Sequence, residues 1–233
     1  MSEPIEVAPR ASGVFRISVR TAAIMLAFTL VFTALMAGTY KATAPLVAAS
    51  TLAEKLRLIG EVLPPTSYDN DLMTDAITLP AQKALGLDDE TRLWRARRDG
   101  TPVALVLEAA APDGYSGRIG LIVAVGVDGK LIAVRVTTHK ETPGLGDYIT
   151  PKKDRNKARP WITQFNNLGF DTVPQEKWRV KKDGGRFDQM SGATISARAV
   201  TNASGRALAW AVENGERLFA LPPDARFEQK EKP

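Results

Sequence analysis

The longest uncharged run of the chain, residues 21–40 (TAAIMLAFTLVFTALMAGTY), limits the fold more than any other feature. A helix of about 20 residues rises about 30 Å, which is the thickness of the hydrocarbon core of a bilayer. The alternatives are a buried core helix and a cleaved signal peptide. Signal peptides have apolar regions of about 7–15 residues, and the best cleavage site here, Ala42-Thr43-Ala44, is followed by Pro45. The run therefore predicts one retained transmembrane helix.

The charges that flank this run predict its orientation. Arg10, Arg16 and Arg20 precede it, whereas Lys41 is the only basic residue in the first dozen positions after it. Basic residues favour the cytoplasmic side of a membrane segment. We therefore expect residues 1–20 to form a cytoplasmic tail. The remainder of the chain would then lie across the membrane, in the periplasm of a Gram-negative cell.

The composition excludes several kinds of site. Cysteine is absent and His139 is the only histidine, so disulfides, iron–sulfur clusters, cysteine nucleophiles and multi-histidine metal centres are excluded. Any redox chemistry must therefore come from a bound organic cofactor, and we expect no metal. The formal net charge of +5 could suggest nucleic acid, but the densest basic run, residues 152–159, contains no aromatic residue. Such a run is typical of a solvated loop or helix face, so we expect no nucleic-acid partner.

The rest of the chain is interpreted as three segments. Residues 41–64 are expected to form a stalk that ends in an amphipathic, membrane-proximal helix, because apolar residues at helical spacing are followed by two prolines. Residues 65–221 are expected to form one domain. Residues 222–233 are rich in proline and charge and are expected to be a loose tail.

Within the domain, patterning predicts an α+β fold. Three strand-like runs, Val103–Glu108, Ile119–Val127 and Leu131–Thr138, indicate an antiparallel meander. A second hairpin is expected around residues 178–189. Apolar positions at helical spacing predict a helix over Ile195–Val212, beginning at or just after the preceding threonine. No dinucleotide-binding glycine fingerprint follows a strand.

The segment before this helix, residues 188–194 (DQMSGAT), admits two interpretations. It is a turn in which Thr194 could cap the helix by accepting main-chain N–H bonds. Alternatively, the free N–H groups and the positive dipole end of the helix could hold an anion such as a phosphate. Arg186 and Arg198 lie close by in the sequence and could pair with that phosphate, but we expect both to be surface charges.

A second segment, residues 139–147 (HKETPGLGD), follows the last predicted strand. Taken alone it is a turn at its proline and glycine, with Glu141 as a solvated charge. In a functional interpretation its glycines let the main chain approach a flat ring. Main-chain N–H groups and Thr142 could then bond the polar edge of that ring.

The sequence DxxSGAT resembles the acceptor sequence of bacterial flavin transferases, which move the FMN part of FAD onto the final threonine. The two segments together resemble the G subunit of the Rnf (Rsx) electron transport complex. They are more distantly similar to the C subunit of the sodium-translocating NADH:quinone reductase. Gly114-Tyr115-Ser116-Gly117 and Trp161-Ile162 also fit this family, so the resemblance covers most of the chain.

The resemblance implies a specific set of site residues. Thr194 would carry FMN through a phosphoester, and Asp188 and Ser191 would be recognised by the flavin transferase. The residues implied around the cofactor are Ser191, Gly192, Ala193, Glu141, Thr142, Gly144, Leu145 and Gly146.

The family also implies a function and partners. The chain would be an electron-relay subunit of an ion-translocating ferredoxin:NAD oxidoreductase in the bacterial inner membrane. It would not be catalytic alone, and it would associate with the A, B, C, D and E subunits and with a flavin transferase during maturation. Alternatives are a component similar to the C subunit of the quinone reductase, a cofactor-free membrane-anchored scaffold, and a binding module for an unattached ligand.

Overall fold

The computed structural model describes residues 11–228, so the first half of the predicted cytoplasmic tail and residues 229–233 lie outside the described residues. The chain divides into two compact units, Met1–Ala53 and Glu54–Pro233. The first unit is helical where it is described, and the second contains the sheet and the second long helix.

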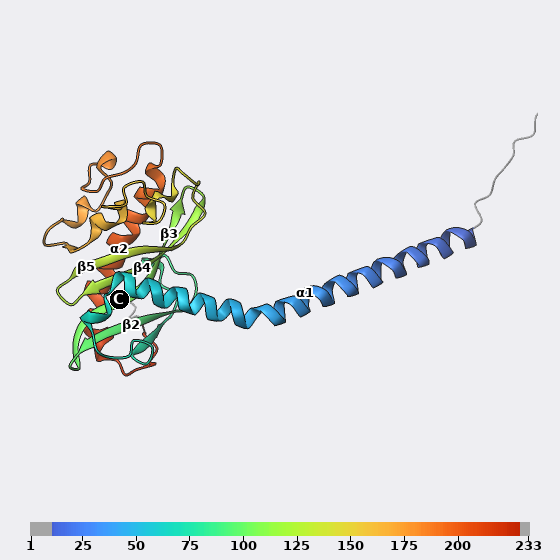
Figure 1. Cartoon of the computed structure of the whole chain (residues 1–233), viewed down its shortest axis with the longest axis horizontal. Coiled ribbons are helices and arrows are strands. Elements are labelled where there is room, and N and C mark those ends of the chain that lie inside the picture. Colours follow the sequence, from blue (N-terminus) through green and yellow to red (C-terminus); the bar gives the residue numbers. More distant parts are fainter. Residues whose placement is uncertain (1–10, 229–233) are drawn as a thin grey trace, which may run out of the picture. The chain divides into compact units, whose positions relative to one another are not determined.

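Helix α1 runs over Ala11–Val62 (Figure 1). Among the described residues, its segment Gly13–Val62 is the one helix long and apolar enough to cross a membrane, with a window of mean hydropathy 2.0. The hydroxyls of Thr29, Thr39 and Thr43 donate at 2.8 Å to the carbonyl four residues earlier. Because polar groups in hydrocarbon must be satisfied within the protein, these bonds suit a helix embedded in lipid.

The predicted division between a transmembrane helix and a separate stalk is absent from α1. The helix continues through residues 41–53, with Pro45 inside it. Proline removes one main-chain donor, but the segment around it is rich in alanine and leucine, which are strong helix formers. The helix propensity of the neighbouring residues therefore outweighs the effect of a single proline.

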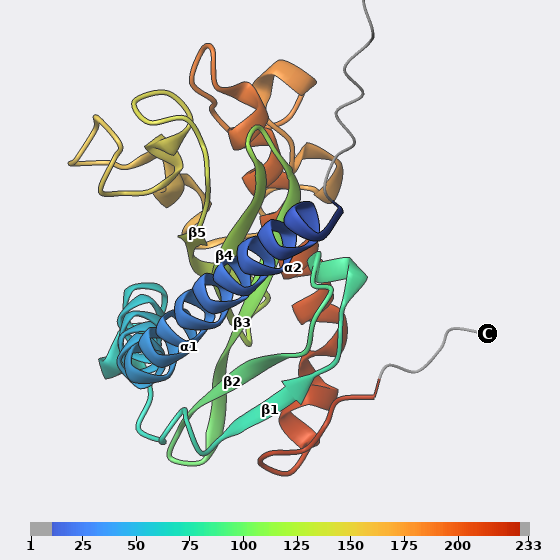
Figure 2. The same ribbon diagram turned by 90° about the vertical axis from the view of Figure 1, so that its right-hand side faces the viewer.

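Six strands form one sheet in sequence order, and every neighbouring pair is antiparallel (Figures 1 and 2). The predicted meander corresponds to β3, β4 and β5, and the α+β class is confirmed. The other three strands were not predicted, because β1 and β6 are short and β2 (TRLWRARR) is rich in arginine. The strands are β1 (Ala76–Leu79), β2 (Thr91–Arg98), β3 (Thr101–Gly114), β4 (Gly117–Gly126), β5 (Lys130–Thr138) and β6 (Leu168–Gly169).

Both faces of the sheet are covered, as the alternation along β3 shows. Leu105 and Leu107 belong to the larger core, under helix α2 (Thr194–Ala220). Ala104 and Val106 belong to the smaller core, which includes the last turns of α1 within the second unit. Successive residues of a strand point to opposite faces, so β3 supplies both cores. Figure 2 shows α2 running along one face of the sheet.

Helix α2 begins at Thr194, as the periodicity predicted, and extends eight residues beyond the expected end at Val212. Most of the predicted apolar face is buried. Ile195 and Val212 are exceptions, with 42% and 51% of their surface exposed. Ile195 lies in the first turn of α2 and lines a surface cavity instead of packing in the core.

Residues 139–193 form a layer of loops and short 3-10 turns at one end of the sheet, which we call the loop layer (yellow to orange in Figure 1). The expected second hairpin is wrong: Val180 and Phe187 form a single bridge of parallel sense, not paired strands. The layer is held by buried aromatic side chains, with Phe165 packing on Phe187 at 4.7 Å and on Trp161 at 5.4 Å between ring centroids. Packing of rings replaces regular main-chain pairing here.

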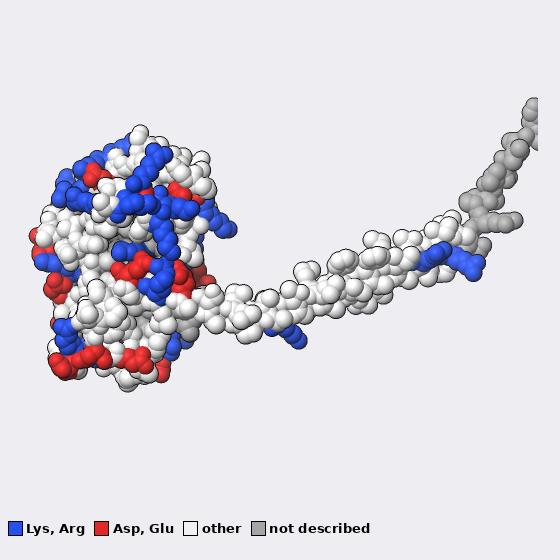
Figure 3. Space-filling view, in the orientation of Figure 1, with Lys and Arg blue, Asp and Glu red and all other residues white. Residues whose placement is uncertain are grey.

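Basic side chains gather over the loop layer (Figure 3). The basic residues of the run 152–159 are exposed, as expected of a solvated loop. Its main chain is ordered by Asp154, a buried carboxylate that accepts the N–H groups of Asn156, at 2.8 Å, and Trp161.

The predicted loose tail is wrong for residues 222–228. Thr78 of β1 exchanges main-chain hydrogen bonds with Ala225 and Phe227 at 2.9 Å. The Phe227 ring is buried and lies 5.7 Å from the Trp210 ring. The segment is therefore fixed to the domain by Phe227 and by its main-chain bonds to β1. Its high content of proline and charge did not predict this.

Candidate functional site

The two sequence motifs meet at the N-terminal end of α2. Ala193 is the N-cap residue and Thr194 is the first helical residue, so the prediction that Thr194 caps the helix is wrong. No side-chain hydrogen bond caps this end, and the half-buried Thr194 hydroxyl has no hydrogen-bond partner among the described residues. An unbonded hydroxyl therefore lies at the positive end of the helix dipole.

The turn before the helix depends on Gly192. Its φ is +85°, a conformation that residues with a side chain rarely adopt. Main-chain bonds hold the turn: the Ala193 N–H donates to the Met190 carbonyl, and the Met190 N–H donates to the Tyr148 hydroxyl, both at 3.1 Å. Burial raises the pKa of Tyr148, partly offset by the bond from Met190. The phenol is therefore a fixed, neutral support beneath the motif.

The loop that carries the other motif is a tight turn. The Thr142 carbonyl accepts the N–H groups of Leu145 and Gly146 at 3.1 and 2.9 Å, and Asp147 accepts that of Gly144 at 2.9 Å. These three main-chain N–H groups are therefore not free to bond the edge of a ring. They are already used within the loop.

Glu141 is not the solvated charge that its turn context suggested. Its surface is 3% exposed, and its carboxylate accepts the Ser116 N–H at 3.0 Å and the hydroxyl of Ser196. Ser116 lies in the turn between β3 and β4, and Ser196 lies in the first turn of α2. One side chain therefore joins three segments that are far apart in the sequence.

A cavity of about 120 Å³ lies between these segments. It brings together six residues predicted from the motifs, in two different loops. Thr194, Gly144, Ser191 and Asp188 do not line it, although Ala193 and Ile195, on either side of Thr194 in the chain, do. Sequence reasoning did not identify Tyr115, Ile195 and Ser196 as site residues; the presence of Tyr115 in a conspicuous Gly-Tyr-Ser-Gly turn was the available signal. The lining residues are Tyr115, Glu141, Thr142, Leu145, Gly146, Gly192, Ala193, Ile195 and Ser196.

The edge of this cavity is apolar and open to solvent. Tyr115, Leu145 and Ile195 expose 65%, 41% and 42% of their surface. They come from three different segments, yet all line the same cavity. Clustered exposed apolar side chains commonly mark a binding site. The arrangement suits a flat, largely apolar ring next to the Thr194 hydroxyl.

The charged residues near the motif have other partners. Arg198 binds Asp183 through two bonds of 2.5 and 2.8 Å, which raise the pKa of Arg198 and lower that of Asp183. Asp188 is exposed and pairs with Lys181 at 2.6 Å. Arg186 is exposed. The expectation that Arg186 and Arg198 are surface charges agrees with these positions.

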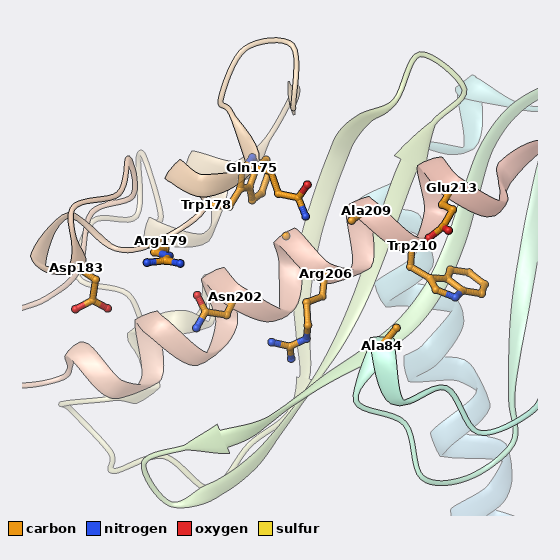
Figure 4. Close-up of a pocket in the computed structure, with 11 residues that line it drawn as sticks. Ala84, Gln175, Trp178, Arg179, Asp183, Asn202, Arg206, Ala209, Trp210 and Glu213 are labelled. Carbon is orange, nitrogen blue, oxygen red and sulfur yellow. The ribbon is translucent and has the colours of Figure 1, made fainter. Parts of the chain in front are cut away.

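A larger groove of about 670 Å³ runs along another side of α2 (Figure 4). Arg206 and Trp210 project from the helix into different parts of it, and Arg179 and Asp183 lie beside it in the loop layer. None of its lining residues belongs to the two motifs. The smaller cavity is therefore the better candidate for a cofactor site.

Comparison with known proteins agrees with this choice. A family model for an FMN-binding domain matches residues 114–209, which contain both motifs, and a model for the RnfG N-terminal region matches residues 12–62. The second match covers most of α1, and the first covers β4, β5, β6, the loop layer and the first sixteen residues of α2.

Curated relatives match most of the chain, and each is named as the G subunit of an ion-translocating oxidoreductase complex. The relative from Pseudomonas aeruginosa (strain UCBPP-PA14) is 42% identical, over 88% of this chain and 94% of the relative. The relative from Shewanella amazonensis is 38% identical, over 88% and 93%, and that from Cronobacter sakazakii is 42% identical, over 87% and 92%. The resemblance inferred from the motifs is confirmed. The chain belongs to the family of G subunits of ion-translocating oxidoreductase complexes.

Proposed function

We propose that the chain is the membrane-anchored electron-relay subunit of an Rnf-type ferredoxin:NAD oxidoreductase and carries FMN as a phosphoester on Thr194. The observation that carries this proposal is the meeting of both motifs at one cavity, which is lined by Ala193 and Ile195, the residues on either side of Thr194 at the N-terminus of α2. Family membership supports the electron-transport role and the FMN. The attachment point is inferred from the resemblance of residues 188–194 to the acceptor sequence of flavin transferases.

The residues fit FMN in two respects. The first-turn N–H groups of α2 have no partner within the helix and favour a phosphate. The cavity is smaller than the usual ligand site of about 300–1,000 Å³, so part of the ring would lie against the exposed apolar edge formed by Tyr115, Leu145 and Ile195.

Attachment requires the Thr194 oxygen to bond to the flavin-side phosphorus of FAD. The bond between that phosphorus and the bridging oxygen breaks, and AMP leaves with the oxygen and, overall, with the hydroxyl proton. A free hydroxyl is a weak nucleophile and must be activated by a base. The two carboxylates of the motif loop, Glu141 and Asp147, are occupied by hydrogen bonds within the chain. We therefore propose that a separate flavin transferase supplies the base.

The residues predicted at the site take different roles in this proposal. Thr194 holds the phosphate. The N–H groups of Leu145 and Gly146 are used within the loop, so the bond to the ring is assigned to the Thr142 side chain instead. Ser191 and Asp188 are exposed and accessible to the transferase. When bound, FMN supplies one-electron and two-electron redox chemistry, and the chain supplies position and electrostatics.

The proposed location follows from α1 and its flanking charges. Membership of the family and the long apolar helix indicate an anchored subunit of a multi-subunit complex. We propose the bacterial inner membrane, with residues 1–20 cytoplasmic and the flavin domain periplasmic. The proposed partners are the A, B, C, D and E subunits. Covalent attachment suits this location, where a dissociated flavin could not readily be replaced.

The test is flavin fluorescence on a denaturing gel after co-expression with a flavin transferase. The wild-type chain is expected to fluoresce, and Thr194→Ala is expected to be dark. Thr201→Ala is a matched control, because Thr201 is buried in the same helix and its hydroxyl also lacks a partner. Intact mass should exceed that of the bare chain by one FMN less one water. A dark wild-type band with an unmodified mass would remove the proposal.

A further inference from the structure

Glu141 is unusual because its buried carboxylate has no basic partner. Its two oxygens are bound by a main-chain N–H and a serine hydroxyl, and no Lys or Arg among the described residues forms an ion pair with it. Buried charges are normally paired, since removing a charge from water is costly. The carboxylate nevertheless lines the cavity between the two motifs.

The surroundings of Glu141 show that its position is closely fixed. A Cβ on Gly146 would lie 2.8 Å from the Ser196 oxygen and 3.1 Å from the Glu141 Cβ, so a larger residue here would displace one of these side chains. Both partners of the carboxylate belong to other segments, the β3–β4 turn and the first turn of α2. The dipole of α2 offsets part of the cost of burial, because anions are favourable at a helix N-terminus.

The same loop contains a second buried carboxylate, that of Asp147. Asp147 is 6% exposed and accepts the Gly144 N–H. Neither carboxylate forms an ion pair among the described residues. The loop therefore contributes negative charge, although exposed basic side chains dominate the outer surface of the loop layer (Figure 3). Charges in a poorly solvated site are screened less than charges at the surface.

We propose that Glu141 is a positioning residue with an electrostatic role. It fixes the first turn of α2 against the motif loop, and its charge lowers the reduction potential of the flavin held there. Reduction adds electrons to the ring, so a fixed negative charge in the wall of the site disfavours the reduced form. This inference rests on the proposed function, but it assigns Glu141 a role other than ligand of the ring.

Glu141→Gln separates the charge from the geometry. The glutamine oxygen can accept the Ser116 N–H, and its amide can donate to the Ser196 oxygen, because a hydroxyl both donates and accepts. The fixed position is therefore retained and the charge is lost. In a redox titration of the flavin-loaded full chain, the ratio of reduced to oxidised flavin at a fixed potential is expected to rise at least tenfold. Tenfold corresponds to about 30 mV for a two-electron couple.

Ser196→Ala is a second variant with the opposite expected sign. It removes one of the two donors to the carboxylate and leaves the charge less compensated, so the reduced-to-oxidised ratio is expected to fall. Asp171→Asn is the control, because Asp171 is an exposed acid of the loop layer that pairs with Lys130. Its ratio should not change. The urea midpoint of Glu141→Gln in the flavin-free Thr194→Ala background should stay close to that of the background.

The outcomes are distinct. A rise for Glu141→Gln with an intact urea midpoint supports the inference. Normal flavin attachment with an unchanged ratio in Glu141→Gln, or the same sign of change in Glu141→Gln and Ser196→Ala, overturns the electrostatic role and leaves the proposed function standing. If Glu141→Gln does not accumulate, the Ser196→Ala variant decides: a fall in the reduced-to-oxidised ratio supports the electrostatic role, and a rise or no change overturns it. A wild-type chain without covalent flavin removes the proposed function, and this inference with it.

Discussion

The two ends of α2 are held by buried charges of opposite sign. At the C-terminal end Arg95 of β2, 1% exposed, donates to the carbonyls of Leu218, at 2.9 Å, and Leu221, and pairs with Asp75. At the N-terminal end Glu141 accepts two hydrogen bonds. Each sign suits the helix dipole, which favours cations at the C-terminus and anions at the N-terminus.

The difference lies in compensation. Arg95 has an acidic partner, and Arg97 adds a second bond to the same Asp75 at 2.8 Å. Glu141 has no ion pair in the described part of the chain, and exposed apolar side chains and an unbonded hydroxyl lie nearby. At one end the buried charge has a partner of opposite sign, as expected of a structural anchor. The other leaves groups available, as expected of a binding site, and such sites often retain locally unfavourable features.

The largest expected effect tests the structural end. Arg95→Ala leaves Asp75 with one fewer cation and removes the Arg95 donor from the carbonyls of Leu218 and Leu221. Loss of one partner of a buried ion pair costs about 3–5 kcal/mol, so the free energy of unfolding should fall by about that amount. Urea unfolding of the full chain measures it.

Arg92→Ala is the matched control on the same strand. Arg92 is exposed and pairs with Asp224 at 2.7 Å. Exposed pairs contribute less than about 1 kcal/mol, so little change is expected. Folded Arg95→Ala protein should still accept flavin, because the altered contacts lie at the other end of α2. Equal losses for the two variants would contradict the assignment of Arg95 as a structural anchor.

A smaller effect is expected at the N-terminal end. Ser196→Ala leaves the Glu141 carboxylate with a single donor, and a buried polar group that loses a partner costs about 1–3 kcal/mol. Ser204→Ala is the control, because Ser204 is also buried in α2 but bonds only the Val200 carbonyl, at 2.8 Å. Thermal unfolding at one pH should rank the variants in the order Arg95→Ala, Ser196→Ala, Ser204→Ala. A Ser204→Ala loss as large as that of Ser196→Ala would show that Glu141 does not organise this end.

The sequence predicted the features that depend on local pattern. The apolar run of α1, the alternation of β3 to β5 and the start of α2 all follow from hydrophobic periodicity. The position of the motifs at one site came from the resemblance, and the cavity agrees with it for six of the predicted residues. Periodicity failed for β2, because the arginine at position 95 is buried by a tertiary ion pair that no local pattern encodes.

The site itself shows where sequence reasoning ends. Glu141 was expected to face solvent or a ligand, yet its partners lie 25 and 55 positions away in the chain. The glycine N–H groups of the same loop were expected to be free, and they close its turn. Such contacts depend on how segments pack. The sequence therefore predicted which two segments meet at the cavity, but not which contacts each residue makes there.

The smallest expected effect concerns Arg198, one turn into α2. Its hydrogen bonds lower the pKa of Asp183 below the ordinary value of 3.8. A carboxyl with a lower pKa in the folded state stabilises the protein above the unfolded value, and this contribution is lost as pH falls through the folded pKa. Arg198→Ala should therefore lower the urea midpoint slightly near neutral pH, and the difference from the wild type should vanish in acid. Flavin attachment should be unchanged. Loss of attachment in Arg198→Ala, with normal attachment in Asp183→Asn, would instead show that Arg198 holds the phosphate, and the N-terminal end of α2 would then contain a cation after all.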